Sequence, residues 1–168
     1  MATKLKLSPD ISYMLGIYSA REEPEQPIRV RAANSEMLER FIKIAISELG
    51  IEPNKILLEG MDASFYNSKI KRLFDRALER RAKTFKYSND YSGSYIAGIF
   101  DCLGGFDKKG MFIRDLDAAD WMLMENIGIH LKAQGSKAYV MNENRLVELI
   151  KRHSSALGVV GNARKSRH

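Results

Sequence analysis

Residues 95–106 read YIAGIFDCLGGF, a short apolar stretch with a glycine near its middle and a glycine pair near its end. Residues 13–22 read YMLGIYSARE and repeat the aromatic residue, the apolar pair, the glycine and the two apolar residues after it. Small residues four positions apart share one face of a helix, and each stretch has such a pair: Gly16 with Ala20, and Gly98 with Cys102. Small residues let two helix backbones approach closely, so the sequence predicts two short helices packed against each other.

The segments after the first stretch show readable periodicity. Apolar residues at helical spacing predict helices, and alternation of apolar and polar residues predicts strands with one wet face. The predicted elements of this half are a helix over 11–21, a strand over 28–31, a helix over 35–49 capped by Asn34 or Ser35, a hairpin over 55–59 and 63–66, and a helix over 68–82.

The second half repeats this order after a polar segment, 88–93, that we expect to be a linker. Its predicted elements are a helix over 95–103, a strand or hairpin over 105–114, a helix over 117–127 with Asp117 and Asp120 capping its start, a hairpin over 129–134 and 137–141, and a helix over 142–153. We therefore expect two repeats, 8–85 and 91–153, followed by a flexible basic tail over 154–168.

Matching residues in the two halves indicate an internal duplication. The spacing of Gly60, Ala63 and Asn67 recurs in Gly135, Ala138 and Asn142, which gives both halves the same turn, strand and helix cap. The period is too long for a solenoid, so the pattern predicts one mixed α/β body built from two related units.

Charge and composition narrow the class of protein. The 168 residues carry 27 Lys and Arg against 21 Asp and Glu, a net charge of +6, which favours an anionic partner such as nucleic acid. No apolar run approaches the roughly 20 residues of a membrane-spanning helix, and no secretory signal is recognisable at the start. A single cysteine excludes an intrachain disulfide and a cysteine-based zinc site, so a cytoplasmic setting is the simplest expectation.

Both glycine-containing stretches resemble the LAGLIDADG signature, and with the duplication the chain is similar over about 8–153 to single-chain, two-repeat homing endonucleases. The resemblance implies a pseudo-two-fold α/β (α+β) fold, a duplicated αββαββα arrangement with two curved antiparallel sheets. These sheets would form a saddle over the DNA major groove. The resemblance also implies that an acid at the end of each central helix binds the divalent metal that activates water for cleavage.

This sequence departs from the family at those acids. The position five residues after each signature glycine is occupied by Arg21 in the first stretch and Leu103 in the second. Neither residue offers the hard oxygen ligands that Mg²⁺ prefers. We therefore expect no catalytic residue, no metal and no cofactor. Mg²⁺ would enter only if neighbouring acids had replaced the lost ones; the candidates are Glu22, Glu23 and Asp101.

The predicted strands still present basic and polar residues on their wet faces. Such side chains contact phosphates and base edges in nucleic-acid complexes. The candidate binding residues are Arg29, Arg31, Lys55, Tyr66, Lys108, Lys109, Arg114, His130, Lys132, Gln134, Lys137 and Tyr139.

The sequence thus favours a protein derived from a LAGLIDADG homing endonuclease that binds DNA or structured RNA without cutting it, in a regulatory, architectural or RNA-associated role. Such a protein could work within a larger nucleoprotein complex, and we expect a monomer because the two halves already supply a pseudo-dimer. Two alternatives remain open: an active Mg²⁺-dependent DNA endonuclease with shifted acids, and an adaptor that uses the saddle for a protein partner.

Overall fold

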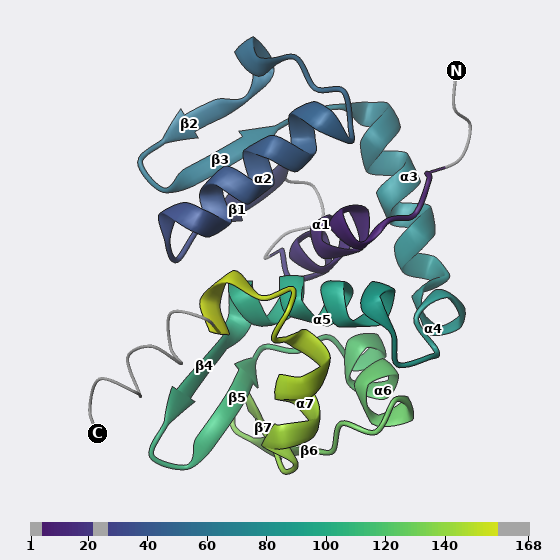
Figure 1. The fold of residues 1–168 in the computed structure, drawn as a ribbon, viewed down its shortest axis with the longest axis vertical. Coiled ribbons are helices and arrows are strands. Elements are labelled where there is room, and N and C mark those ends of the chain that lie inside the picture. Colours follow the sequence, from purple (N-terminus) through teal and green to yellow (C-terminus); the bar gives the residue numbers. More distant parts are fainter. Residues whose placement is uncertain (1–4, 22–26, 158–168) are drawn as a thin grey trace.

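The computed structural model describes residues 5–21 and 27–157, which form a mixed α/β structure with two antiparallel sheets. Two helices, α1 (Pro9–Ser19) and α5 (Asp90–Leu103), lie side by side between the sheets (Figure 1). Most residues of both helices are buried. The predicted central helix pair is therefore present, and it forms the core that the rest of the chain surrounds.

The first sheet has three described strands in the order β1-β3-β2. The elements of this half are β1 (Ile28–Arg31), α2 (Ser35–Ser47), the short 3-10 helix η1 (Pro53–Lys55), β2 (Leu57–Glu59), β3 (Asp62–Phe65), α3 (Ser68–Glu79) and α4 (Arg81–Thr84). The side-chain oxygen of Asn34 accepts the Met37 N–H, so Asn34 is the predicted cap of α2. Phe41 of α2 packs against Phe65 of β3, which holds this helix on the sheet.

The second sheet has four strands in the order β4-β5-β7-β6. Its elements are β4 (Gly104–Asp107), β5 (Gly110–Arg114), α6 (Ala118–Asn126), β6 (Leu131–Gln134), β7 (Lys137–Val140) and α7 (Glu143–Ile150). The hairpins predicted at 105–114 and 129–141 are both present. Gly135 turns between β6 and β7 with φ of 62°, a conformation that favours glycine.

The closest approach of the central helices is at the two signature glycines. A Cβ atom built on Gly16 would overlap the carbonyl oxygen of Tyr95 and lie 3.1 Å from the Gly98 Cα. A Cβ on Gly98 would overlap the carbonyl oxygen of Tyr13. The backbones are in direct contact there, so glycine is the residue that fits both positions.

The predicted linker over 88–93 is wrong from Asp90 on, because α5 begins there. The Asn89 side chain accepts the Tyr91 and Ser92 backbone N–H groups, and the Ser92 hydroxyl accepts the Asn89 N–H. This capping box starts the helix within the polar segment. Gly93 is also a packing residue, since a Cβ there would lie 2.6 Å from the Leu149 carbonyl oxygen.

Asp120 was expected to cap α6, but it is a buried residue that connects the two halves. Asp117, the other predicted cap, does cap the helix, by accepting the Ala119 N–H. Asp120 is 2 % exposed and accepts hydrogen bonds from the hydroxyls of Ser19, at 2.5 Å, and Tyr95, at 2.6 Å. Arg81 approaches it at 3.3 Å and also donates to Ser19. Burial raises the pKa of Asp120, and these donors and the Arg81 charge oppose that shift.

The start of the expected flexible tail is held by the rest of the protein. Asp101 is 5 % exposed and accepts the Ser154 hydroxyl at 2.5 Å and the backbone N–H groups of Ser155 and Ala156 at 2.8 and 3.1 Å. The Tyr13 hydroxyl also donates to Asp101, at 2.6 Å. Asp101 therefore ties both central helices to the chain that follows α7. The rest of the expected tail, from 158 on, lies outside the described residues.

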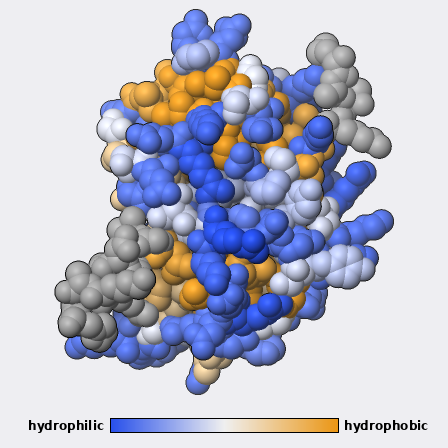
Figure 2. All heavy atoms as spheres, in the orientation of Figure 1, coloured by the Kyte–Doolittle hydropathy of each residue, from blue (hydrophilic) through white to orange (hydrophobic). Residues whose placement is uncertain are grey.

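Within the described ranges, none of the helices has the length and apolar character needed to cross a bilayer. Figure 2 shows a largely hydrophilic surface on one side of the molecule, where apolar residues form a patch in the lower part and a broader one over the upper half. Exposed apolar side chains of that half include Ile46 of α2, and Leu57 and Leu58 of β2.

Candidate nucleic-acid interface

One face of the four-stranded sheet carries the predicted basic residues, and the strand register places them in two rows. The inward residues Met111 and Ile113 of β5 are buried, so their neighbours point to the opposite face. Residues paired directly across neighbouring antiparallel strands share a face. One row contains Arg114, Lys137 and Gln134, and the other contains Phe112, Tyr139 and Lys132.

Phe112 is a residue of this face that the sequence analysis missed. Its ring contacts Tyr139 edge-on, with centroids 6.0 Å apart, and the Lys137 ammonium lies 4.2 Å from its centroid. Gly105 leaves room for the ring, because a Cβ there would be 2.7 Å from the Phe112 Cζ. The sequence did contain a signal for Phe112: the apolar residues Met111 and Ile113 flank it in the strand, so Phe112 lies on the opposite face. The result is an aromatic and basic face, a combination that suits both phosphates and bases.

An acid was also missed on this face. Asp107 accepts hydrogen bonds from the Tyr139 hydroxyl at 2.6 Å and the Lys137 ammonium at 2.9 Å. These two donors, with the Lys109 backbone N–H, lower the pKa of Asp107 to about 2. Hydrogen bonding to Asp107 raises the pKa of both Lys137 and Tyr139. The face is therefore basic overall, but Asp107 neutralises part of its positive charge.

Asp107→Asn is expected to tighten nucleic-acid binding. The substitution removes a negative charge beside Lys137 and frees that ammonium for a phosphate, so we expect roughly a fivefold gain in affinity at low salt. Because the folded-state pKa of Asp107 is depressed, its carboxylate stays charged as the pH falls until about 2 is approached. The difference between variant and parent should therefore persist over pH 5–8, which fluorescence anisotropy would measure. An unchanged or weaker affinity would remove this face from the interface.

The exposed face of the first sheet has mixed charge. Arg29 and Arg31 point away from the core as predicted, while Ile28 and Val30 are buried. Asp62, on the neighbouring strand, accepts from Arg29 Nε at 2.8 Å and lies 3.6 Å from Arg31 Nε. The Arg29 guanidinium holds the pKa of Asp62 below its usual range. One carboxylate is thus shared by two arginines.

The remaining candidates lie at the rims of the sheets. Lys55 is wrongly placed by the sequence analysis, because it belongs to η1 and precedes β2. Tyr66 follows β3 and is 68 % exposed. Lys108 and Lys109 form the turn between β4 and β5. His130 precedes β6, and its Nδ1 lies 3.2 Å from a Glu125 carboxylate oxygen.

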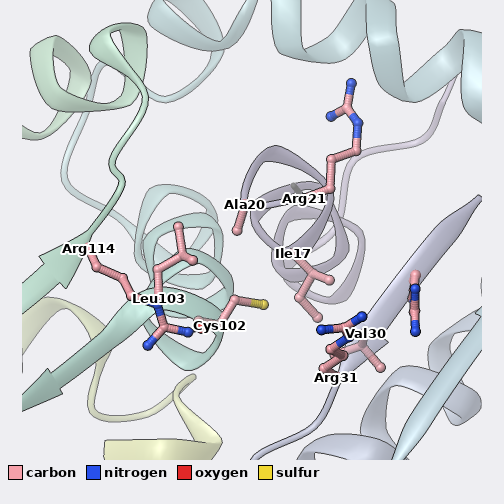
Figure 3. Close-up of a pocket in the computed structure, with 9 residues that line it drawn as sticks. Ile17, Ala20, Arg21, Val30, Arg31, Cys102, Leu103 and Arg114 are labelled. Carbon is pink, nitrogen blue, oxygen red and sulfur yellow. Dashed lines mark hydrogen bonds between the residues drawn. The ribbon is translucent and has the colours of Figure 1, made fainter. Parts of the chain in front are cut away.

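A pocket lies between the two sheets, where the central helices end. Figure 3 shows it beside the last turns of α1 and α5. Its volume is about 130 Å³. It is lined by Ile17, Ala20, Arg21, Arg29, Val30, Arg31, Cys102, Leu103 and Arg114. The small residues Ala20 and Cys102 and the two replaced positions, Arg21 and Leu103, all border this space.

In the last turn of each central helix, an arginine side chain binds a backbone carbonyl oxygen. Arg21 Nη1 donates to the Tyr18 carbonyl oxygen at 2.7 Å, and its guanidinium lies 3.8 Å from the Tyr18 ring centroid. Arg114 Nη2 donates to the Cys102 carbonyl oxygen at 3.2 Å. The negative ends of two helix dipoles, which favour cations, are thus occupied by guanidinium groups of the chain itself.

The residues around this pocket do not fit Mg²⁺. Among its described lining residues four are arginines and none is a carboxylate, whereas Mg²⁺ requires hard oxygen ligands. Elsewhere in the described residues no group of three or more His, Cys, Asp or Glu could hold a metal ion. Of the three candidate acids, Asp101 is engaged by four donors. Glu22 and Glu23 lie outside the described residues.

Cys102 is a packing residue on α5. Burial, with Asp101 next to it, raises the pKa of its thiol to about 12. A thiol with that pKa stays protonated at neutral pH and is a poor nucleophile. This agrees with its expected role as a small side chain between the central helices.

Comparisons with known proteins give no family for this chain. No protein-family model matches its sequence, and a search of curated proteins finds no significant match.

Proposed function

We propose that this protein binds DNA or structured RNA on the exposed faces of its two sheets, and that it is a degenerate relative of the two-repeat LAGLIDADG homing endonucleases. The observation that carries the proposal is the contact of Gly16 with Gly98 at the centre of two similarly ordered halves. The small residues of the two signature stretches predicted that these helices pack closely against each other.

The order of elements supports a duplicated fold. After its central helix, each half continues through strand, helix, hairpin and helix. The second half has a two-stranded hairpin, β4 and β5, before its middle helix. The first half shows only β1 there among the described residues, since 22–26 are outside them. A saddle formed by the two sheets is the arrangement that we propose.

The shared pocket supports a continuous binding surface. Arg29 and Arg31 of the first sheet and Arg114 of the second sheet line the same space. We propose that the exposed faces of the two sheets meet at the ends of the central helices. A polyanion lying along one sheet would reach the other, and the net charge of +6 would favour it over neutral partners.

We propose that the protein does not cleave the nucleic acid that it binds. Arg21 and Leu103 occupy the positions where the resemblance requires metal-binding acids. The surrounding guanidinium groups raise the electrostatic potential, and a divalent cation is repelled by it. The protein would then hold a nucleic acid without cutting it, in a regulatory, architectural or RNA-associated role, as a monomer within a larger nucleoprotein complex.

The first test is binding of labelled duplex DNA and of structured RNA across a salt series with Mg²⁺ present. We expect affinity that falls steeply with salt concentration, with no new bands on a denaturing gel. Cleavage products would favour the endonuclease alternative with shifted acids. Failure to bind either polymer would favour a protein adaptor.

A charge-reversal variant locates the interface. Lys132 is exposed on β6, in the row with Phe112 and Tyr139, and Lys132→Glu is expected to weaken binding about tenfold at low salt. Lys43→Glu is the matched control, because Lys43 is exposed on α2, outside both sheets. Equal losses for the two variants in an anisotropy titration would show that only net charge matters.

A further inference from the structure

We infer that the pocket at the ends of α1 and α5 is an anion site that takes one phosphate group, held by Arg31 and Arg114 from opposite sheets. The inference deepens the proposed function and rests on it where the phosphate belongs to a nucleic acid. Figure 3 shows the two side chains on either side of Cys102, one from each half of the molecule.

The charge balance around the pocket favours an anion. Four arginines line it, and three of them pair with Asp62 or Asp75. Asp62 serves both Arg29 and Arg31, and Asp75 is shared between Arg21 and Lys71. An anion entering the pocket would be attracted by the four arginines that line it.

Two of the arginines are placed to bind it. Arg31 is 66 % exposed, and its distance to Asp62 is 3.6 Å, beyond a good hydrogen bond. The Arg114 side chain is held in place by its hydrogen bond to the Cys102 carbonyl oxygen. This bond uses one of the five N–H donors of the guanidinium group. Planar guanidinium groups bind phosphate oxygens through paired N–H bonds, which suits these free donor positions.

The size and lining of the pocket suit a small oxyanion. Its volume of about 130 Å³ is slightly below the roughly 150 Å³ of an engineered cavity that admits benzene. Ile17, Ala20 and Leu103 supply an apolar wall, which lowers the local dielectric and strengthens attraction between the arginines and a phosphate. The neighbouring Cys102 thiol is neutral at physiological pH and adds no opposing charge.

The first experiment uses inorganic phosphate as the probe and needs no nucleic acid. Titration of the full chain, followed through the arginine Nε–Hε signals by NMR, should give saturable shifts at Arg31 and Arg114. Arg152, which is 75 % exposed beyond α7, should shift weakly and without saturation. The double variant Arg31→Gln/Arg114→Gln should abolish the saturable response, while thermal melting checks that it remains folded.

The second experiment measures the salt dependence of nucleic-acid binding. Each lost phosphate contact reduces the slope of log K against log salt by about 0.9 for duplex DNA. We expect a reduction of about 1 for Arg31→Gln or Arg114→Gln and about 2 for the double variant. Arg152→Gln is the control with the same change of charge and should leave the slope unchanged.

The two experiments separate the inference from the proposed function. Nucleic-acid binding with unchanged slopes and no saturable phosphate response would overturn the anion site and leave the proposed function standing. Saturable phosphate binding in a protein that binds neither DNA nor RNA would support the site and refute the proposed function.

Discussion

Gly98→Ala should lower the free energy of unfolding by about 3 kcal/mol, the upper end of the usual cost of overpacking a core. The new Cβ would overlap the Tyr13 carbonyl oxygen and lie 3.0 Å from the Ile17 backbone nitrogen and 3.1 Å from the Gly16 Cα. These are backbone atoms, so relief requires the two central helices to separate. Urea unfolding followed by circular dichroism would measure the change.

The sign of the effect is diagnostic. Glycine to alanine inside a helix normally stabilises by about 1 kcal/mol, so a loss shows that close helix contact outweighs helix propensity. Gly135→Ala is the control, because nothing lies within 4 Å of its Cβ position and its cost comes from φ of 62° alone, about 1 to 2 kcal/mol. If Gly98→Ala were neutral or stabilising, the helix crossing described above would be wrong.

Asp101→Ala is expected to cost about 4 kcal/mol, near the limit for a single substitution. It would leave the buried Tyr13 hydroxyl, the Ser154 hydroxyl and the backbone N–H groups of Ser155 and Ala156 without their acceptor. Buried polar groups that lose a partner cost about 1 to 3 kcal/mol each. Hydrogen exchange should show the largest loss of protection at the two N–H donors.

Tyr13→Phe provides the comparison for that prediction. It removes one of the four donors to Asp101 and leaves the carboxylate paired, so the expected cost is about 1 kcal/mol. If Asp101→Ala cost no more than Tyr13→Phe and abolished DNA cleavage, Asp101 would be a catalytic acid, as the endonuclease alternative requires. A large stability loss in a protein without cleavage activity would assign it to the structure.

Periodic and local features of this fold could be predicted from the sequence. Small residues four apart predicted the contact of α1 and α5, and alternation predicted the exposed face of β1 and of the β6–β7 hairpin. These features depend on neighbours within a few positions. The start of α5 was missed because Asn89 and Ser92 resemble linker residues until their reciprocal cap bonds are seen.

Long-range pairing could not be predicted. Asp62 lies 33 residues from Arg29, and Asp107 lies 30 from Lys137, yet these acids determine how much positive charge each sheet presents. Asp120 was predicted to cap α6, but it is buried and accepts hydrogen bonds from the Ser19 and Tyr95 hydroxyls. The basic residues of the proposed binding faces could thus be predicted from residue type. The acids that pair with them and neutralise part of their positive charge could not.

Arg81 has a consequence for cooperativity. It belongs to α4, at the end of the first half, and contacts Ser19 of α1 and both Asp117 and Asp120 near the start of α6. If the halves were produced as separate fragments, Asp120 would be left in one piece and its cationic partner in the other. Neither fragment could satisfy its buried groups alone, so the chain should unfold in a single transition, and co-expressed fragments should assemble only with each other.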